Sequence, residues 1–123
     1  MFSIPSLVLR KLYTYGSLQN TINGPRFEIK NRLSDASIVE VLGAEIDGIS
    51  FNPEQITLEY PDGRQLRASE ITTASPLKFG LKDRLFFQLK GAGLGTGKHA
   101  ISFSVLTEKI GRLNVKVEDS LGE

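Results

Sequence analysis

The sequence predicts an all-β protein, an antiparallel β-sandwich of the immunoglobulin or fibronectin type with eight or nine short strands. Apolar residues recur at every second position in five separate segments, which is the pattern of strands buried on one face. Turn-forming residues, among them Asp47-Gly48 and Pro61-Asp62-Gly63, separate several of these segments. No stretch of ten or more residues shows the apolar stripe of an amphipathic helix.

Residues 1–9 form the first predicted element, an apolar N-terminal arm ahead of a single domain over residues 10–123. The arm reads MFSIPSLVL, and its positive charges, Arg10 and Lys11, come after the apolar run. A secretory signal has the opposite order, so the arm is not expected to be one. It lies loosely on its own domain, or it docks on another chain, because exposed apolar side chains are costly in water. The partner-binding residues predicted here are Phe2, Ile4, Leu7 and Leu9.

The body of the domain follows as strands joined by short connections. The expected strands cover residues 13–18, 26–33, 38–46, 49–51, 56–60, 64–67, 85–90, 98–107 and 113–117. Asn23-Gly24 is expected to turn the chain between the first two strands. Leu42-Gly43 breaks the alternation of the third strand, which predicts a bulge. Residues 68–71 read as a single helical turn that plugs one end of the sandwich.

The glycine-rich run GAGLGTGK at residues 91–98 does not fit a phosphate-binding loop. A Walker loop needs glycine where Ala92 stands, and serine or threonine where His99 stands. A dinucleotide fingerprint starting at Gly91 needs glycine where Thr96 stands. The segment that follows reads as a strand, so it offers no helix N-terminus to a phosphate. We expect a flexible hairpin connection here.

The composition limits the possible chemistry. The chain has no cysteine and one histidine, which excludes disulfides, thiolate catalysis and cysteine or multi-histidine metal sites. The formal net charge is +1 with charges spread singly, which argues against a nucleic-acid partner. No stretch approaches the length of a membrane span. We therefore expect no catalytic residue, metal or cofactor, no membrane partner, and a cytoplasmic location.

Four residues are candidates for binding a ligand: His99, Tyr13, Tyr15 and Phe27. His99 shares the parity of Ile101 and Phe103, which points it toward the core and predicts a structural role. It has no second titratable group nearby in sequence, as acid–base catalysis would need, but it could act as a local pH switch. The three aromatic rings pack in the core, or they form an exposed platform for a sugar.

The segment from residue 44 to 105 also carries a resemblance to a known family. An "IDG" hairpin, a strand beginning "PEQI", and "GLGTGKHAI" before a strong strand occur in this order. Their combination resembles the small β subunits of bacterial C-glycoside deglycosidases. The resemblance implies a β-sandwich scaffold for a larger barrel subunit that holds the metal and the acid–base residues. A fainter similarity is to short chains labelled hydroxymethylglutaryl-CoA reductase, although this chain lacks room for that enzyme's cofactor and substrate domains.

These observations predict a non-catalytic accessory subunit that binds and stabilises a larger enzyme, which the resemblance makes a sugar-processing one. The alternatives are a small-molecule or carbohydrate-binding sandwich that uses the aromatic residues, and a stand-alone enzyme that uses His99. A homo-oligomer is compatible with each of them, because the open edges of a sandwich need protection.

Overall fold

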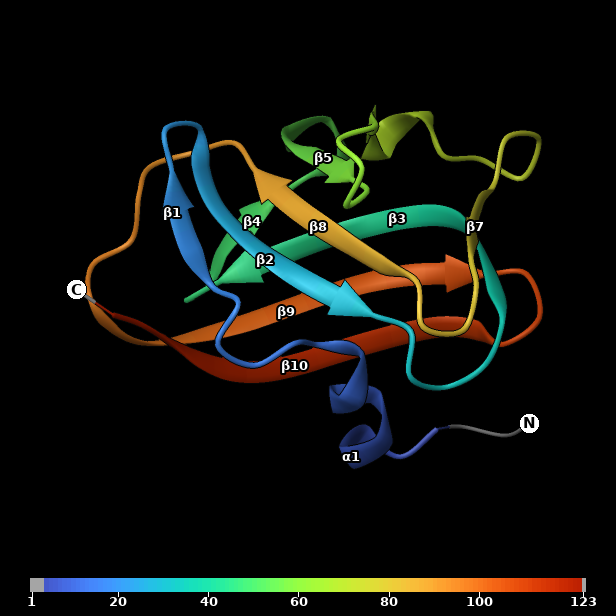
Figure 1. Cartoon of the computed structure of the whole chain (residues 1–123), viewed down its shortest axis with the longest axis horizontal. Coiled ribbons are helices and arrows are strands. Elements are labelled where there is room, and N and C mark those ends of the chain that lie inside the picture. Colours follow the sequence, from blue (N-terminus) through green and yellow to red (C-terminus); the bar gives the residue numbers. More distant parts are fainter. Residues whose placement is uncertain (1–3, 123) are drawn as a thin grey trace.

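Two antiparallel sheets packed face to face form the structure, a computed structural model that describes residues 4–122 (Figure 1). In the first, sheet A, the strand order is β1-β2-β8-β5-β6. In the second, sheet B, the order is β10-β9-β3-β4, and β7 also pairs with β3. The predicted antiparallel β-sandwich is therefore confirmed.

The elements of residues 4–122 are short, apart from three strands of eleven residues. The strands are β1 (Gln19–Thr21), β2 (Gly24–Lys30), β3 (Ala36–Ile46), β4 (Ile49–Phe51), β5 (Ile56–Glu59), β6 (Gln65–Arg67), β7 (Leu77–Phe79), β8 (Arg84–Leu89), β9 (Gly97–Thr107) and β10 (Gly111–Leu121). The helical elements are α1 (Ser6–Leu9) and the 3₁₀ turns η1 (Arg10–Leu12), η2 (Pro53–Gln55) and η3 (Ala68–Glu70).

The core lies between the sheets and is built from alternate residues of the facing strands. Its centre is aromatic: the ring centroids of Phe27 and Phe87 lie 5.2 Å apart, and both rings contact Phe103 from the opposite sheet. The predicted inward residues of β8, β9 and β10 are buried, while the residues between them face outward. Each large apolar side chain buried in this way stabilises the fold by about 1.5–3 kcal/mol.

The hairpins predicted from turn residues are present. Asp47 and Gly48 connect β3 to β4 with φ angles of 53° and 83°, the positive values that a type I′ turn requires. Pro61-Asp62-Gly63 connects β5 to β6, and the Tyr60 N–H donates to the Arg64 carbonyl at 2.8 Å. The predicted bulge in β3 appears as a register shift between Val41 and Gly43. The predicted plug is also present, because η3 packs against β3 of one sheet and β5 of the other.

Two expectations about strands were wrong. Residues 13–18 are not a strand but an irregular segment that turns at Gly16, where φ is +86°, and β1 begins only at Gln19. Residues 77–79 form β7, which pairs with Ala36–Ile38 of β3 and brings the strands to ten in residues 4–122. Three residues are too few for an alternating pattern to be recognised in the sequence.

The glycine-rich connection, residues 91–97, joins the two sheets rather than closing a hairpin. It leads from β8 of sheet A to β9 of sheet B, so the expected hairpin connection was wrong. At its start the Gly91 N–H donates to the Asn23 carbonyl at 3.1 Å. Gly24 permits this approach, since a Cβ there would lie 2.4 Å from the Leu89 carbonyl oxygen, and its φ of +142° also favours glycine.

Candidate interaction surface

The N-terminal segment, residues 4–18, covers one side of the sandwich instead of extending away from it. After Pro5 the chain forms α1 and η1, which pack against β10, the edge strand of sheet B (Figure 1). Leu9 and Leu12 point inward and are buried, whereas Leu7 is 71% exposed. Ile4 is partly buried against the core, and Phe2 lies outside the described residues. Of the three predicted partner-binding residues that the structure describes, only Leu7 is largely exposed.

The carboxylate of Asp119 makes several hydrogen bonds that fasten this segment to sheet B. Asp119 of β10 accepts hydrogen bonds from the Tyr13 hydroxyl at 2.7 Å, from the Gly16 N–H at 2.9 Å, and from the Leu18 N–H at 3.3 Å. Burial and the hydrogen bond to Asp119 raise the pKa of the Tyr13 hydroxyl, so it stays protonated and donates. No local pattern in the sequence indicates this contact, because Tyr13 and Asp119 are 106 positions apart.

The three aromatic residues proposed for ligand binding do not form an exposed platform together. Tyr13 and Phe27 are in the core, with 1% and 0% of their surface exposed. Tyr15 is 56% exposed and stands edge-on to Tyr13, with centroids 5.4 Å apart. The core-packing alternative therefore describes two of the rings, and Tyr15 is the one that a binding partner can reach.

Basic side chains surround Tyr15 and Leu7. Arg10, Lys11 and Arg32 are exposed, and with Leu7 and Tyr15 they line a shallow hollow. Arg32 is held in place, because its guanidinium donates to the Lys11 carbonyl at 2.7 Å and to the Thr14 hydroxyl at 3.1 Å. We name these five residues the N-terminal patch. Within residues 4–122, no carboxylate lies at ion-pair distance from its three basic groups.

His99 lies near the start of β9, directly opposite Asp119 of β10, and the structure gives it a partner that sequence reasoning missed. Its Nδ1 lies 2.6 Å from Asp47 Oδ2 and its Nε2 lies 2.7 Å from the Gly95 carbonyl oxygen. Both partners only accept hydrogen bonds, so both ring nitrogens are satisfied as donors only when the ring is protonated. The hydrogen bond to Asp47 and that to Gly95 raise the pKa of His99. The expected inward parity is found, but with both nitrogens occupied the ring is not free to act as a base.

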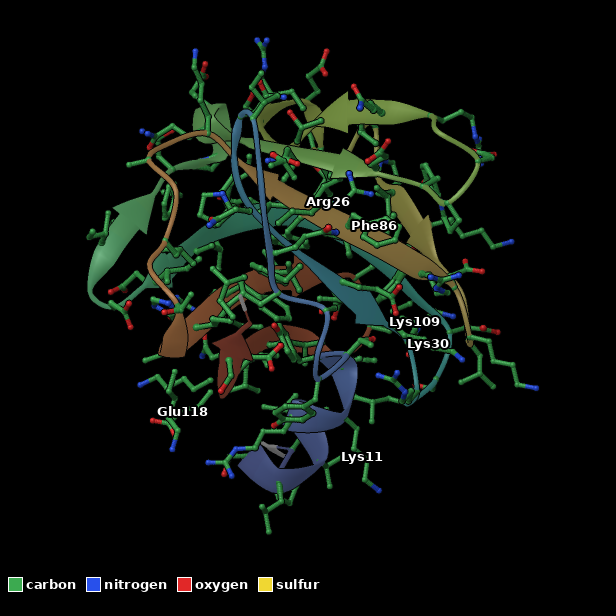
Figure 2. The ribbon with its side chains drawn as sticks, turned by 60° about the vertical axis from the view of Figure 1, so that its left-hand side comes forward. Lys11, Arg26, Lys30, Phe86, Lys109 and Glu118 are labelled. Atoms are coloured by element: carbon green, nitrogen blue, oxygen red, sulfur yellow. The ribbon has the colours of Figure 1, made fainter. Side chains whose placement is uncertain are left out.

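On the outer face of sheet A, several charged side chains form ion pairs with one another. Glu28 is buried and accepts from Arg84 Nη2 at 2.6 Å and from the Thr14 hydroxyl at 2.8 Å. Burial alone would raise the pKa of Glu28, but these hydrogen bonds and the charge of Arg84 lower it. Arg26 pairs with Glu59 and lies over the Phe86 ring, as Figure 2 shows. This face therefore offers a partner few unpaired charges.

The outer face of sheet B is hollowed and polar. Residues of its three longest strands, with Arg10 and Tyr15 from the N-terminal segment, line a shallow hollow; they include Glu45, Ala100, Ser102, Lys116 and Glu118. Arg10 and Tyr15 thus border both this hollow and the hollow of the N-terminal patch. In Figure 2, Glu118 and Lys11 are seen on opposite sides of α1.

The acidic groups of residues 4–122 do not converge on a metal site. No three of the Asp, Glu and His side chains in this part of the chain come close enough together to hold an ion. The same residues contain no helix long and apolar enough to cross a membrane.

Comparison with known proteins gives one family. The family model described as hydroxymethylglutaryl-CoA reductase, N-terminal domain, matches residues 8–122, which is nearly the whole chain. A search among curated proteins finds no match. The resemblance to the β subunits of C-glycoside deglycosidases was wrong, because the family that matches is a different one. The fainter similarity to chains with a reductase label agrees with the family model.

Proposed function

The chain belongs to the family of the hydroxymethylglutaryl-CoA reductase N-terminal domain, and from this premise we propose that it is a non-catalytic accessory unit that binds a larger enzyme. The N-terminal patch is the surface that makes the contact. In this role the sandwich is a rigid support, and the chemistry belongs to the enzyme that it binds. The proposed compartment is the cytoplasm.

One observation carries the proposal: Leu7 and Tyr15 are exposed although the segment that holds them is firmly anchored. Leu9, Leu12 and Tyr13 of the same segment are buried in the core. The exposure of Leu7 and Tyr15 is therefore not explained by a segment that lies away from the sandwich. An exposed tyrosine and an exposed leucine that line the same hollow form the apolar centre typical of a protein–protein contact. The occupied nitrogens of His99 and the internal pairing on sheet A support a binding surface rather than a catalytic site.

The family name makes the catalytic chain of hydroxymethylglutaryl-CoA reductase from the same genome the first partner to test. The two proteins are co-expressed, one of them is tagged, and the complex is isolated and analysed by size exclusion with light scattering. We expect a stable complex that Leu7→Ser and Tyr15→Ser each weaken at least tenfold, since an apolar anchor at an interface contributes about 2 kcal/mol or more.

Two other exposed apolar residues provide the matched control. Ile22 and Ile49 are 101% and 64% exposed and lie outside the patch, so Ile22→Ser and Ile49→Ser are expected to leave the complex unchanged. If no complex forms, or if all four variants bind alike, the proposal is wrong.

A further inference from the structure

Resting on the proposed function, we infer that the N-terminal patch binds an acidic segment of the larger enzyme, in which an apolar side chain stands beside carboxylates. The basic groups around Leu7 and Tyr15, and the contacts that hold Arg32 and Tyr15 in place, point to this chemistry.

The charge of the patch has one sign. Arg10, Lys11 and Arg32 are exposed around Leu7 and Tyr15, and the carboxylates that bond the N-terminal segment are already engaged. Asp119 is taken by three donors of the N-terminal segment, and Glu28 by Arg84 and Thr14. Glu118, at the border with the sheet B hollow, lies 3.9 Å from Lys98. An incoming carboxylate therefore meets basic groups that form no ion pair among residues 4–122.

The patch is also preorganised. Tyr15 is held edge-on to the buried Tyr13, whose hydroxyl is fixed by Asp119. Arg32 is oriented by the Lys11 carbonyl and the Thr14 hydroxyl. An interface whose anchor residues are ordered before contact loses less conformational entropy on binding, which partly offsets the entropy that a flexible acidic segment loses when it binds.

A lipid surface is the less suitable partner for the same residues. Membrane-surface helices present a long apolar face, whereas α1 has four residues and exposes a single large apolar side chain, Leu7. The planar guanidinium groups of Arg10 and Arg32 suit bidentate contacts with carboxylates. The acidic protein segment is therefore the proposal, and vesicle binding becomes an outcome of its test.

The first experiment measures binding of a fluorescein-labelled peptide of 15 residues, in which Glu alternates with Leu, to the full chain by fluorescence anisotropy. A peptide with Lys in place of Glu is the comparison. We expect the acidic peptide to bind at least tenfold more tightly, and its affinity to fall as salt is raised from 25 to 300 mM, because screening weakens contacts between exposed charges. No binding of the acidic peptide up to 1 mM, or equal binding of both peptides, would overturn the inference.

Variants then locate the site. The double variant Arg10→Glu, Lys11→Glu is expected to bind the acidic peptide at least tenfold more weakly. The neutral double variant Arg10→Gln, Lys11→Gln is expected to have an intermediate affinity. The neutral pair covers the possibility that reversed charge disturbs α1. Lys78→Glu with Lys90→Glu is the matched control, since both lysines are exposed and outside the patch. Equal binding by all variants contradicts the inference.

The remaining outcomes separate this inference from the proposed function. If the reductase chain needs Leu7 and Tyr15 but binds the Arg10→Glu, Lys11→Glu variant equally well at every salt concentration, the accessory role stands and the acidic segment is wrong. Tight binding to phosphatidylserine vesicles without binding of the acidic peptide also overturns it. A concentration-dependent dimer of this chain that Leu7→Ser disrupts would assign the patch to a second copy instead.

Discussion

Two segments outside the sheets, the N-terminal segment and the glycine-rich connection, are fastened to the sandwich in different ways. The N-terminal segment, residues 4–18, places four apolar side chains in the core: Leu9, Leu12, Tyr13 and Leu18. The glycine-rich connection, residues 91–97, has only the half-buried Leu94 and is held by hydrogen bonds to Asn20, Asn23 and His99. Burial of apolar surface does not depend on protonation, whereas one of the polar contacts includes a titratable ring. We therefore expect the glycine-rich connection to open locally more easily than the N-terminal segment.

The largest effect that the comparison predicts comes from Leu12. Replacing this buried side chain in Leu12→Ala should lower the free energy of unfolding by about 3 kcal/mol, because it removes apolar burial and leaves a cavity. Leu94→Ala in the other segment, where the side chain is half-buried, should cost about 1 kcal/mol. Urea unfolding measured by tyrosine fluorescence gives both values. Similar losses for the two variants would remove the distinction between the segments.

Asp119→Ala should have the next largest effect, a loss of about 2 kcal/mol. The substitution leaves the buried Tyr13 hydroxyl without its acceptor and frees two N–H groups of the N-terminal segment. Asp119→Asn keeps one acceptor oxygen, so its free energy of unfolding should fall by less than that of Asp119→Ala. The same unfolding experiment gives the values, and hydrogen exchange at Gly16 and Leu18 should speed up in proportion. Unchanged exchange at these two amides would mean that Asp119 does not fasten the segment.

The local stability of the glycine-rich connection should change with pH as His99 loses its proton, whereas that of the N-terminal segment should not change over the same range. His99 has its pKa raised above the ordinary 6.5 in the folded state, so its contribution to stability is complete below pH 6.5 and is lost as the pH rises through the folded value. The pKa of Asp47 is lowered by His99 and by the Ala100 N–H, so its contribution is lost only as the pH falls below its ordinary 3.8. The contact between His99 and Asp47 is therefore strongest at mildly acidic pH.

Two-dimensional NMR tests this pH dependence directly. The His99 ring should titrate above pH 6.5, and amide exchange in residues 91–97, corrected for the intrinsic effect of pH, should accelerate as the ring loses its proton. Exchange in residues 9–18 should not change over the same range. In His99→Gln, the step in residues 91–97 should be absent. A titration at or below pH 6.5 would contradict the geometry of two acceptors around the ring.

The smallest predicted effect is that of Asn20. Its side chain donates to the Leu94 carbonyl and accepts from the Leu94 N–H, both at 2.9 Å, on the surface. Asn20→Ala should lower global stability by about 0.5 kcal/mol, since exposed hydrogen bonds exchange with water at little cost. It should nonetheless increase exchange at Leu94 itself. A loss of more than 2 kcal/mol would show that the connection is as integral to the fold as the N-terminal segment.

The parts of the fold that depend on neighbouring residues were predictable from the sequence. Alternation in residues 101–105 and 113–117 identified β9 and β10, and Asp47-Gly48 identified the β3–β4 hairpin. The contacts that define the candidate surface join distant residues instead. Asp47 and His99 are 52 positions apart, and Asp119 reaches Tyr13 across nearly the whole chain. Periodicity carries no information about such pairs. The bonds between Asp119 and residues 13–18, and the contact between His99 and Asp47, therefore emerged only from the structure.

The bond between Tyr13 and Asp119 also has a consequence for the order of folding. Tyr13 leaves the ribosome early in synthesis and Asp119 more than a hundred residues later. Until β10 has been made and has paired with β9, α1 and η1 lack their contacts with β10, and the Tyr13 hydroxyl lacks its acceptor. The patch is therefore complete only after the last strand has been made, so we expect a partner that recognises it to bind the finished domain and not the growing chain.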